Sequence, residues 1–269
     1  MVFFPGCKIN LGLNVLSKRA DGFHNLETCF YPVNWQDVLE LIPAKTYNLE
    51  LSGINLPASG ENLCTKVFNL MHAQYKINPV HAWLHKNIPH GAGLGGGSSD
   101  AATMISGLNN LFQLGLDQST LEELALKAGS DCPFFIHPVP KLATGRGEIF
   151  EPLNFTLAGK WIVLMKPEES ISTAEAYKNV QIGTPDFGIK TVLESAPIAE
   201  WKSKLSNAFE PYAFRKIPQL LSLRDLLYKH GALFAAMSGS GSAMFGIFEQ
   251  EPEHLEIPKN VLHWRGILG

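Results

Sequence analysis

The chain has 269 residues, of which 45% are hydrophobic and 17% are charged, and its formal net charge is -3. That length allows one large domain or two modest ones, and the apolar content excludes a disordered chain or a small disulfide-held scaffold. The slightly negative charge argues against a nucleic-acid-binding protein but leaves nucleotide binding open, because a few backbone N–H groups can hold a phosphate.

The first third of the chain shows patterns typical of strands, turns and helices. Over residues 9–15 apolar and polar side chains alternate, which predicts a half-buried strand, and residues 19–22, Arg-Ala-Asp-Gly, then predict a turn. Residues 61–75 place several apolar side chains on one helical face, so a helix is predicted there. Further strands are predicted at residues 28–33, 38–42 and 80–84.

A glycine-rich loop follows from Gly91 to Gly97, within the sequence His-Gly-Ala-Gly-Leu-Gly-Gly-Gly-Ser-Ser that starts at His90. Glycines tolerate positive φ and let the backbone approach a ligand closely. When such a run opens a helix, several N–H donors lie at the positive end of the helix dipole, which favours phosphate binding. A flexible surface linker is the alternative, but the flanking strand and amphipathic helix favour the phosphate site.

The common nucleotide-binding motifs do not fit this loop. Gly91, Gly93 and Gly96 satisfy GxGxxG, but the loop follows several strands that look antiparallel, and no acidic residue comes at the distance that a dinucleotide fold requires. A Walker A loop would need a lysine before the serines, and a protein kinase would need HRD and DFG triplets. The loop therefore predicts a phosphate site outside these classes.

Two helices are predicted after the loop. Ser98 or Ser99 is the expected N-cap of the first, and Asp100 would complement the positive end of its dipole. The second is predicted to start with a capping box at Ser119 and to end at Gly129. The apolar face of the first helix recurs at helical spacing and consists of Ala101, Ile105, Leu108 and Phe112.

The rest of the chain predicts more strands than helices. Asp131 lies in a loop, Pro133 favours an extended Cys132, and residues 134–136 are expected to form a buried strand. Residues 150–160 are a candidate hinge, and the whole pattern indicates an α+β fold in two lobes. Further strands are expected at residues 161–165, 233–237 and 243–248, and a helix at 218–230.

Several segments resemble the GHMP kinases (galacto-, homoserine, mevalonate and phosphomevalonate kinases). Residues 89–99 are similar to the ATP-binding motif of that family, and residues 237–242, Met-Ser-Gly-Ser-Gly-Ser, are similar to its third motif. Residues 8–16 and 19–28 narrow the resemblance to the branch that phosphorylates a cytidyl diphosphate-linked methylerythritol on its 2-hydroxyl, in the non-mevalonate route to isoprenoid precursors. The resemblance extends to about Phe248, nearly the whole chain.

The resemblance implies a fold and a division into domains. A ribosomal-S5-domain-2-like, ATP-binding domain would span residues 1–155, and a ferredoxin-like domain would span residues 156–269. It also implies ATP as cofactor, together with Mg²⁺, whose ligands the sequence does not assign.

The same resemblance implies a set of site residues. The catalytic pair would be Lys8 and Asp131. The nucleotide would be bound by Asn62, Pro89, His90, Gly91, Ala92, Gly93, Leu94, Gly95, Gly96, Gly97, Ser98 and Ser99. The cytidyl substrate would be bound by Asn10, Phe23, His24, Tyr177, Gly239, Ser240 and Gly241.

The chemistry of phosphoryl transfer suits these residues. Asp131 would accept the hydroxyl proton, although it could instead orient that hydroxyl or help to hold magnesium, and Lys8 would neutralise charge on the transferred group. The cytosine ring would stack between Phe23 and Tyr177, with His24 hydrogen-bonding its edge. Position 23 is more often Tyr in this branch, so any hydrogen bond from that hydroxyl is absent here.

Three alternatives stay open at this point. The Ser-Gly-Ser-Gly-Ser segment at 238–242 can donate N–H groups to a diphosphate or simply form a tight β connection. The chain could be another GHMP kinase, acting on homoserine or mevalonate, but the Arg19–His24 segment argues against that. It could also be a non-catalytic nucleotide-binding protein, against which the presence of both Lys8 and Asp131 argues.

The cysteines indicate a compartment. Cys7, Cys29, Cys64 and Cys132 form no CxxC pair and fit free thiols in a reducing cytoplasm. No apolar run approaches the roughly 18 residues that a membrane span needs. We expect a cytoplasmic monomer or weak homodimer that binds a small molecule, and neither nucleic acid nor membrane.

Overall fold

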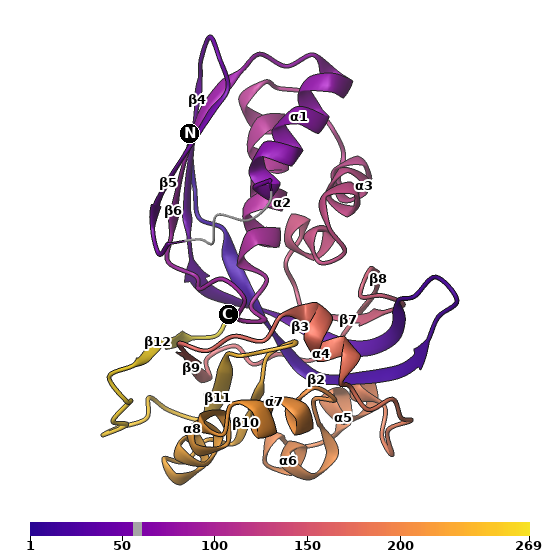
Figure 1. The fold of residues 1–269 in the computed structure, drawn as a ribbon, viewed down its shortest axis with the longest axis vertical. Helices are drawn as coiled ribbons and strands as arrows, with labels where there is room; N and C mark the ends of the chain where they lie inside the picture. Colours follow the sequence, from indigo (N-terminus) through magenta and orange to yellow (C-terminus); the bar gives the residue numbers. More distant parts are fainter. Residues whose placement is uncertain (56–60) are drawn as a thin grey trace. The chain divides into compact units, whose positions relative to one another are not determined.

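The computed structural model describes residues 1–55 and 61–269. Within that part the chain forms two compact units, and neither is a continuous segment. Both combine sheets with helices (Figure 1), which confirms the expected α+β fold, while the predicted boundary at residue 155 stays a prediction. Unit 1 is Met1–Cys7, Trp35–His90 and Gly95–Pro138, and unit 2 is Lys8–Asn34, Gly91–Leu94 and Val139–Gly269.

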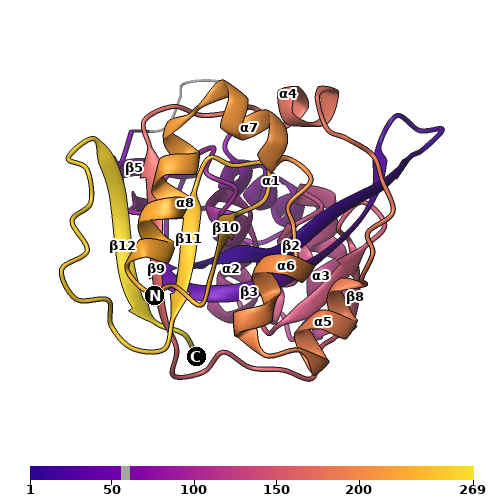
Figure 2. The same ribbon diagram turned by 90° about the horizontal axis from the view of Figure 1, so that it is seen from below.

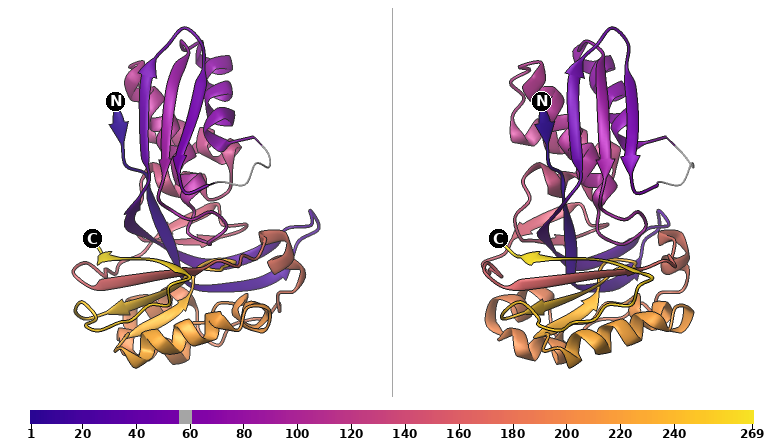
Figure 3. Two further views of the ribbon diagram at one scale, coloured as in Figure 1. Left: turned by 60° about the vertical axis from the view of Figure 1, so that its left-hand side comes forward. Right: turned by 90° about the vertical axis from the view of Figure 1, so that its left-hand side faces the viewer.

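Unit 1 is a four-stranded sheet with helices against one face (Figure 3). Its strand order is β1-β4-β6-β5, and neighbours are antiparallel except for parallel β5 and β6. Alternate residues of β4 and β6 are buried against the helices, as the two-residue period of a strand requires. The strands are β1 (Val2–Phe3), β4 (Val38–Pro43), β5 (Asn48–Gly53) and β6 (Val80–Lys86). The helices are α1 (Leu63–Tyr75), α2 (Gly96–Leu111), α3 (Gln118–Ala128) and the 3-10 helix η1 (Cys132–Ile136).

Unit 2 contains two four-stranded sheets. The first has the order β2-β3-β7-β8, and the second, which is antiparallel throughout, has the order β10-β11-β9-β12. The first consists of β2 (Gly6–Lys18), β3 (His24–Gln36), β7 (Lys141–Thr144) and β8 (Ile149–Pro152). The second consists of β9 (Trp161–Pro167), β10 (Phe234–Met237), β11 (Met244–Phe248) and β12 (Val261–Ile267).

Two helices of unit 2, Trp201–Lys204 and Gln219–Lys229, contact the second sheet. Helix α8 packs on β9, β10 and β11 (Figure 2) and buries Leu220, Leu223 and Leu227, which recur at helical spacing. The helices are α4 (Thr173–Lys178), α5 (Ile189–Ser195), η2 (Ile198–Glu200), α6 (Trp201–Lys204), α7 (Glu210–Lys216) and α8 (Gln219–Lys229).

Most predicted strands and helices are confirmed with small shifts at their ends, but the first strand is not half-buried. Residues 9–15 belong to the longer β2, in which nine consecutive residues are buried on both faces. Asn10 and Asn14 lie inside because their amides donate to Thr28 and Glu27. The alternation of polar residues therefore reports buried hydrogen bonds and not a solvent-facing side.

The strand predicted at residues 134–136 is wrong. Those residues belong to the 3-10 helix η1, and Cys132 is its first residue instead of an extended one. Pro133 lies in the first turn of η1. A backbone N–H there would have no partner within the helix, so the missing N–H of proline costs no hydrogen bond. A short apolar run does not distinguish a strand from a buried helical turn.

The predicted cap of α3 is also wrong. Asp117, two residues before Ser119, accepts a hydrogen bond from the Thr120 N–H at 2.9 Å and caps the helix. The predicted end at Gly129 is confirmed. No prediction was made from the sequence for β1, β5, β7, β8, β12 or the short helices α4 to α7. In the described part of the chain no helix has the length and apolar character that a membrane crossing requires.

Candidate active site

Lys8 lies in β2, and its ammonium group is buried in unit 2. Its Nζ donates to Asn10 Oδ1 at 2.6 Å and to the Gly93 carbonyl at 3.0 Å, and lies 4.7 Å from the centre of the Phe30 ring. The Asn10 amide N–H is committed to Thr28 Oγ1 at 2.9 Å, which leaves its oxygen facing the ammonium. Lys8 is therefore held in one orientation, as is required of a group that stabilises negative charge developing in a transition state.

The first half of the glycine-rich loop, Gly91–Leu94, belongs to the same unit. Gly91 and Gly93 have φ of 61° and 75°, a region that other residues rarely adopt. A Cβ on Gly93 would lie 1.9 Å from the Ser238 carbonyl oxygen, so only glycine fits there. The glycine at position 93 thus serves close packing of two loops as well as the left-handed turn.

The second half of the loop opens α2 in unit 1. The N-cap is Gly95, with φ of 71°, and the helix starts at Gly96, so the expected caps Ser98 and Ser99 are wrong because both lie inside the first turn. No side chain caps the helix, and the first-turn N–H groups have no acceptor within it. Gly97 is exposed, and a Cβ there would meet nothing within 4 Å. These features fit an anion site.

A buried ion cluster supports this helix start. Lys86, at the end of β6, pairs with both Asp37 and Asp100, and all three side chains are nearly inaccessible. Burial alone would lower the pKa of Lys86, but the two carboxylates outweigh it and raise that pKa. Burial raises the pKa of Asp100 to about 7, against the opposing effect of Lys86. Asp100 is thus buried against Lys86 and lies beyond the first turn of α2, which contains no acidic residue, contrary to its predicted role at the positive end of the dipole.

Asp131 and Asn62 also lie in unit 1. Asp131 is half-buried directly before η1. Asn62 is the N-cap of α1, and its Oδ1 accepts from the Cys64 N–H at 2.8 Å. That bond leaves the Asn62 amide N–H groups available to a nucleotide, and the binding role of Asn62 stays a prediction.

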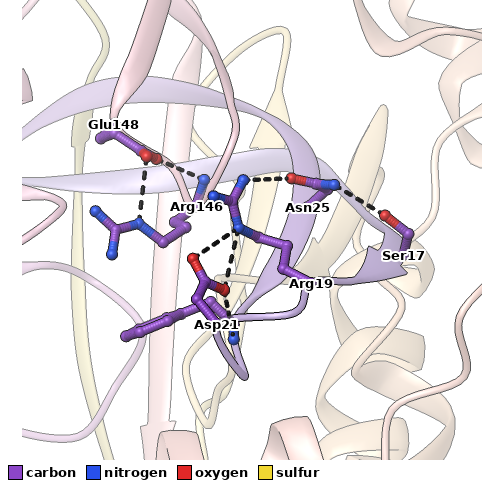
Figure 4. Close-up of polar contacts among 7 residues, drawn as sticks. Ser17, Arg19, Asp21, Asn25, Arg146 and Glu148 are labelled. Atoms are coloured by element: carbon purple, nitrogen blue, oxygen red, sulfur yellow. Dashed lines mark hydrogen bonds and ion pairs between the residues drawn. The ribbon is translucent and has the colours of Figure 1, made fainter.

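The turn between β2 and β3 carries the predicted cytidyl-binding residues, and Arg19 holds it together. Arg19 Nε donates to both carboxylate oxygens of Asp21 at 3.2 and 3.1 Å, and Nη1 donates to Asn25 Oδ1 at 2.9 Å (Figure 4). The arginine, aspartate and asparagine of this motif thus fix the backbone that presents Phe23 and His24.

Phe23 and His24 have different neighbours. Phe23 is 53% exposed, and the guanidinium carbon of Arg146 lies 4.9 Å from its ring centre. Glu148 anchors Arg146 by accepting from its Nε at 3.3 Å (Figure 4). The His24 ring stacks on Tyr177, with centres 5.0 Å apart and planes at 22°. Tyr177 thus faces His24, and a cytosine between Phe23 and Tyr177 stays a prediction.

The segment 238–242 forms a tight turn between β10 and β11. The Gly241 N–H donates to the Ser238 carbonyl at 3.0 Å, and Gly239 and Gly241 are buried with φ of 55° and 87°. Ser240 is half-buried, and its hydroxyl lies 3.5 Å from that of Thr173. The tight connection is therefore present, and diphosphate binding by this turn stays a prediction.

Comparison with known proteins assigns the family. The descriptions "GHMP kinases N terminal domain" and "GHMP kinases C terminal" match residues 62–138 and 193–258. The 4-diphosphocytidyl-2-C-methyl-D-erythritol kinase of Cytophaga hutchinsonii is 49% identical over 94% of this chain and 94% of that protein. The protein of the same name from Parabacteroides distasonis is 44% identical over 95% and 94%. The chain belongs to the GHMP kinase family.

Solved structures agree with that assignment. A crystal structure of 4-(cytidine 5'-diphospho)-2C-methyl-D-erythritol kinase covers 100% of this chain and 99% of its own, with a TM-score of 0.82 and 33% identity. A mevalonate kinase structure reaches a TM-score of 0.76 at 14% identity, so it shows only the shared fold. This GHMP kinase is thus a small-molecule kinase, and the resemblance seen in the sequence is confirmed.

Sequence reasoning missed several residues that shape the sites of this GHMP kinase. Arg146 lies between Gly145 and Gly147, which both have positive φ, and such a Gly-x-Gly triplet could have indicated a tight exposed loop. Lys86 and Asp37 are 49 residues apart, and no local pattern connects them. Asn207 is buried in a connection between helices, where the sequence carries no motif.

Proposed function

We propose that this GHMP kinase transfers the γ-phosphoryl group of ATP to the 2-hydroxyl of 4-diphosphocytidyl-2-C-methyl-D-erythritol, in the non-mevalonate route to isoprenoid precursors. The observation that carries the proposal is 49% identity, over 94% of the chain, with a kinase of that name. The Arg19 network supports it further, because it rigidifies the segment that distinguishes this branch from other GHMP kinases.

Two residues would carry out the transfer. The 2-hydroxyl oxygen forms a bond to the γ-phosphorus while the bond from that phosphorus to the bridging oxygen of ADP breaks. Asp131 accepts the hydroxyl proton, and Lys8 neutralises charge on the phosphoryl group in flight. The two hydrogen bonds that orient the Lys8 ammonium support this role.

The nucleotide phosphates would bind at the start of α2. Gly95, Gly96 and Gly97 place uncapped N–H groups at the positive end of a helix of 16 residues. Asn62 would reach the nucleotide through its amide N–H. The remaining residues of the loop shape the backbone around these donors and consist of Pro89, His90, Gly91, Ala92, Gly93, Leu94, Ser98 and Ser99.

Magnesium would come with the nucleotide. Among the described residues no group of three or more His, Cys, Asp or Glu side chains could hold a metal ion. Mg²⁺ usually binds through one or two carboxylates together with nucleotide phosphates and water. ATP and water would therefore supply most of the ligands of the ion.

The cytidyl substrate would bind in unit 2. Phe23 and Tyr177 offer ring faces, and His24 offers a polar edge. The turn at Gly239–Gly241 would present backbone N–H groups to the diphosphate, apart from that of Gly241, which donates to the Ser238 carbonyl. All four cysteines are free thiols, which fits a reducing compartment, and we propose that the enzyme works in the cytoplasm.

The decisive experiment measures ADP release by the purified chain with MgATP and three alcohols in parallel. The alcohols are the cytidyl substrate, mevalonate and homoserine, and turnover is expected with the first alone. Faster turnover of mevalonate or homoserine would replace the proposed substrate. ATP binding without turnover of any alcohol would favour a non-catalytic nucleotide-binding protein.

A further inference from the structure

Asn207 is a buried polar residue to which the proposed reaction gives no role. It lies just before α7 and is 3% exposed. Its amide nitrogen donates to the carbonyls of Met237 and Gly239, both at 2.8 Å, and its oxygen accepts from the Phe209 N–H at 2.9 Å. A buried amide with both ends bonded fixes the backbone on either side of Ser238.

Ser238 transmits that constraint to two other segments of unit 2. Its hydroxyl donates to the Gly93 carbonyl at 2.9 Å and accepts from the Asn10 N–H at 3.2 Å. Gly239 is equally close, since a Cβ there would lie 3.1 Å from the Gly93 oxygen and 3.2 Å from Asn10 Oδ1. Any displacement of the turn would therefore move Gly93 or Asn10 as well.

Gly93 and Asn10 are also the residues that orient Lys8. The ammonium group donates to Asn10 Oδ1 at 2.6 Å and to the Gly93 carbonyl at 3.0 Å. A continuous path of hydrogen bonds thus runs from Asn207 through the turn to Lys8, and all of it lies within unit 2.

We infer that Asn207 is a positioning residue that fixes Lys8 for phosphoryl transfer, acting through the Ser238 turn. The inference rests on the proposed function, in which Lys8 neutralises the transferred group. Glu210 supports the same turn, since its carboxylate accepts from the Met237 N–H at 2.8 Å. A misplacement of about 1 Å in a catalytic group can cost about a hundredfold in rate, so this distant support matters to turnover.

A purely structural role makes a different prediction. If Asn207 only stabilised the connection between β10 and β11, its replacement would lower the free energy of unfolding and would affect turnover independently of Lys8. If it acts through Lys8, its effect on kcat must disappear once the Lys8 ammonium is gone.

The test is a double-mutant cycle with Asn207→Asp and Lys8→Met, measured on the full chain. Asn207→Asp keeps the size of the side chain but places an oxygen against two carbonyl oxygens. We expect kcat for the cytidyl substrate to fall about tenfold to a hundredfold while KM for ATP changes by less than about twofold. In the Lys8→Met background the same substitution should cause no further loss.

Asn109→Asp is the matched control. The Asn109 side chain also bridges a backbone segment, accepting from the Leu116 N–H at 3.0 Å, but it lies in unit 1 at the far end of α2 from the glycine loop. Its kcat should stay at the wild-type value. If Asn207→Asp does not fold, Ser238→Ala removes only the linking hydroxyl and enters the same cycle.

Two results would overturn the inference. One is a kcat for the folded Asn207→Asp variant within about twofold of wild type, and the other is a full additional loss in the Lys8→Met background. Wild-type turnover of the cytidyl substrate is measured first, because its absence contradicts the proposed function, whereas a failed cycle contradicts only the role of Asn207.

Discussion

Asp131 is the residue on which the proposed chemistry depends most directly. It precedes η1 and makes no side-chain capping bond to that helix. Because asparagine keeps the size of the side chain but cannot accept the hydroxyl proton, we expect Asp131→Asn to lower kcat by about a hundredfold or more, while ATP affinity and the free energy of unfolding stay near wild type. Steady-state kinetics, nucleotide titration and urea unfolding together check this.

Asp117→Asn is the control for that substitution. Asp117 caps α3, and asparagine caps a helix about as well as aspartate does, so both stability and turnover should be retained. A near-normal kcat for Asp131→Asn would reject proton acceptance by its carboxylate and leave it an orienting role.

Phe23 and Arg146 form one stacked pair, so their contributions to substrate binding should not be independent. Phe23→Ala is expected to raise KM for the cytidyl substrate by about fivefold to a hundredfold, because base stacking on an aromatic ring contributes about 1–3 kcal/mol. Arg146→Ala should raise it less, and the double variant should be no worse than Phe23→Ala alone, because the guanidinium lies on that ring. KM values for both substrates test this.

Lys202→Ala is the control for the loss of a cation from an aromatic ring. The Lys202 ammonium lies 4.2 Å from the centre of the Tyr228 ring, and neither residue is among the predicted binding residues. Its KM for the cytidyl substrate should match wild type. Equal increases in KM for ATP and for the cytidyl substrate in Phe23→Ala would contradict a specific stacking role.

At the scale of elements, the two halves of the glycine-rich loop should respond oppositely to an added methyl group. Gly93→Ala forces a left-handed backbone, which costs roughly 1–2 kcal/mol, and drives a Cβ into the Ser238 carbonyl. In Gly97→Ala the added Cβ has no neighbour within 4 Å, and alanine favours a helix over glycine, so the substitution should stabilise the fold by about 0.5–1 kcal/mol. The same methyl group should raise KM for ATP, because it crowds the N–H groups at the helix start. Urea unfolding and ATP kinetics measure both effects.

Gly115→Ala separates backbone strain from the clash. Gly115 also has a positive φ, of 65°, but a Cβ there would meet nothing within 4 Å. Gly93→Ala should therefore be less stable than Gly115→Ala. Equal stability of the two would show that the loop does not pack against the Ser238 turn.

The elements that were predicted correctly from the sequence have strong apolar patterns. Helices α1, α2 and α8 each show an apolar stripe, and β9, β10 and β11 are apolar runs with turn residues around them. The short helices α4 to α7 could not be predicted from the sequence, because a segment of one or two turns is stabilised by its tertiary contacts and not by its own apolar pattern. The start of α2 was misplaced because a glycine cap leaves no side-chain signal.

For the whole molecule, the buried cluster of Lys86, Asp37 and Asp100 links stability to pH. The pKa of Asp100 is raised to about 7, mainly by burial, from a model-peptide value of 3.8. Between these values the folded chain holds a proton that the unfolded chain releases, so this group's contribution to stability is lost as pH rises from about 4 through about 7. Asp100→Asn should therefore gain stability relative to wild type as pH rises from about 5 to about 8.

Urea unfolding at three pH values across that window measures the difference. Asp186→Asn, at an exposed aspartate, is the control and should keep a constant difference from wild type. Parallel stability curves for wild type and Asp100→Asn would contradict a proton held by Asp100 in the folded state.

Recognition of the candidate site from sequence depended on segments that carry motifs. The glycine loop, the Arg19–His24 segment and the surroundings of Asp131 could all be named because their residues are contiguous. The supporting partners could not, since Asn10 and Ser238 are 228 residues apart and Lys86 and Asp37 are 49 apart. Only the fold brings such pairs within hydrogen-bonding distance.

The discontinuity of the two units has a consequence for how this gene can be cut or recombined. The chain passes from one unit to the other between residues 7 and 8, 34 and 35, 90 and 91, 94 and 95, and 138 and 139. A fragment that starts after residue 155 would lack Leu13, whose N–H and carbonyl pair with Ser206 and Ala208 at 2.8 Å each. The segments before and after residue 155 therefore cannot be exchanged independently between related proteins. A chimaera joined at residue 155 must take β2 and the residues that pair with it from the same protein.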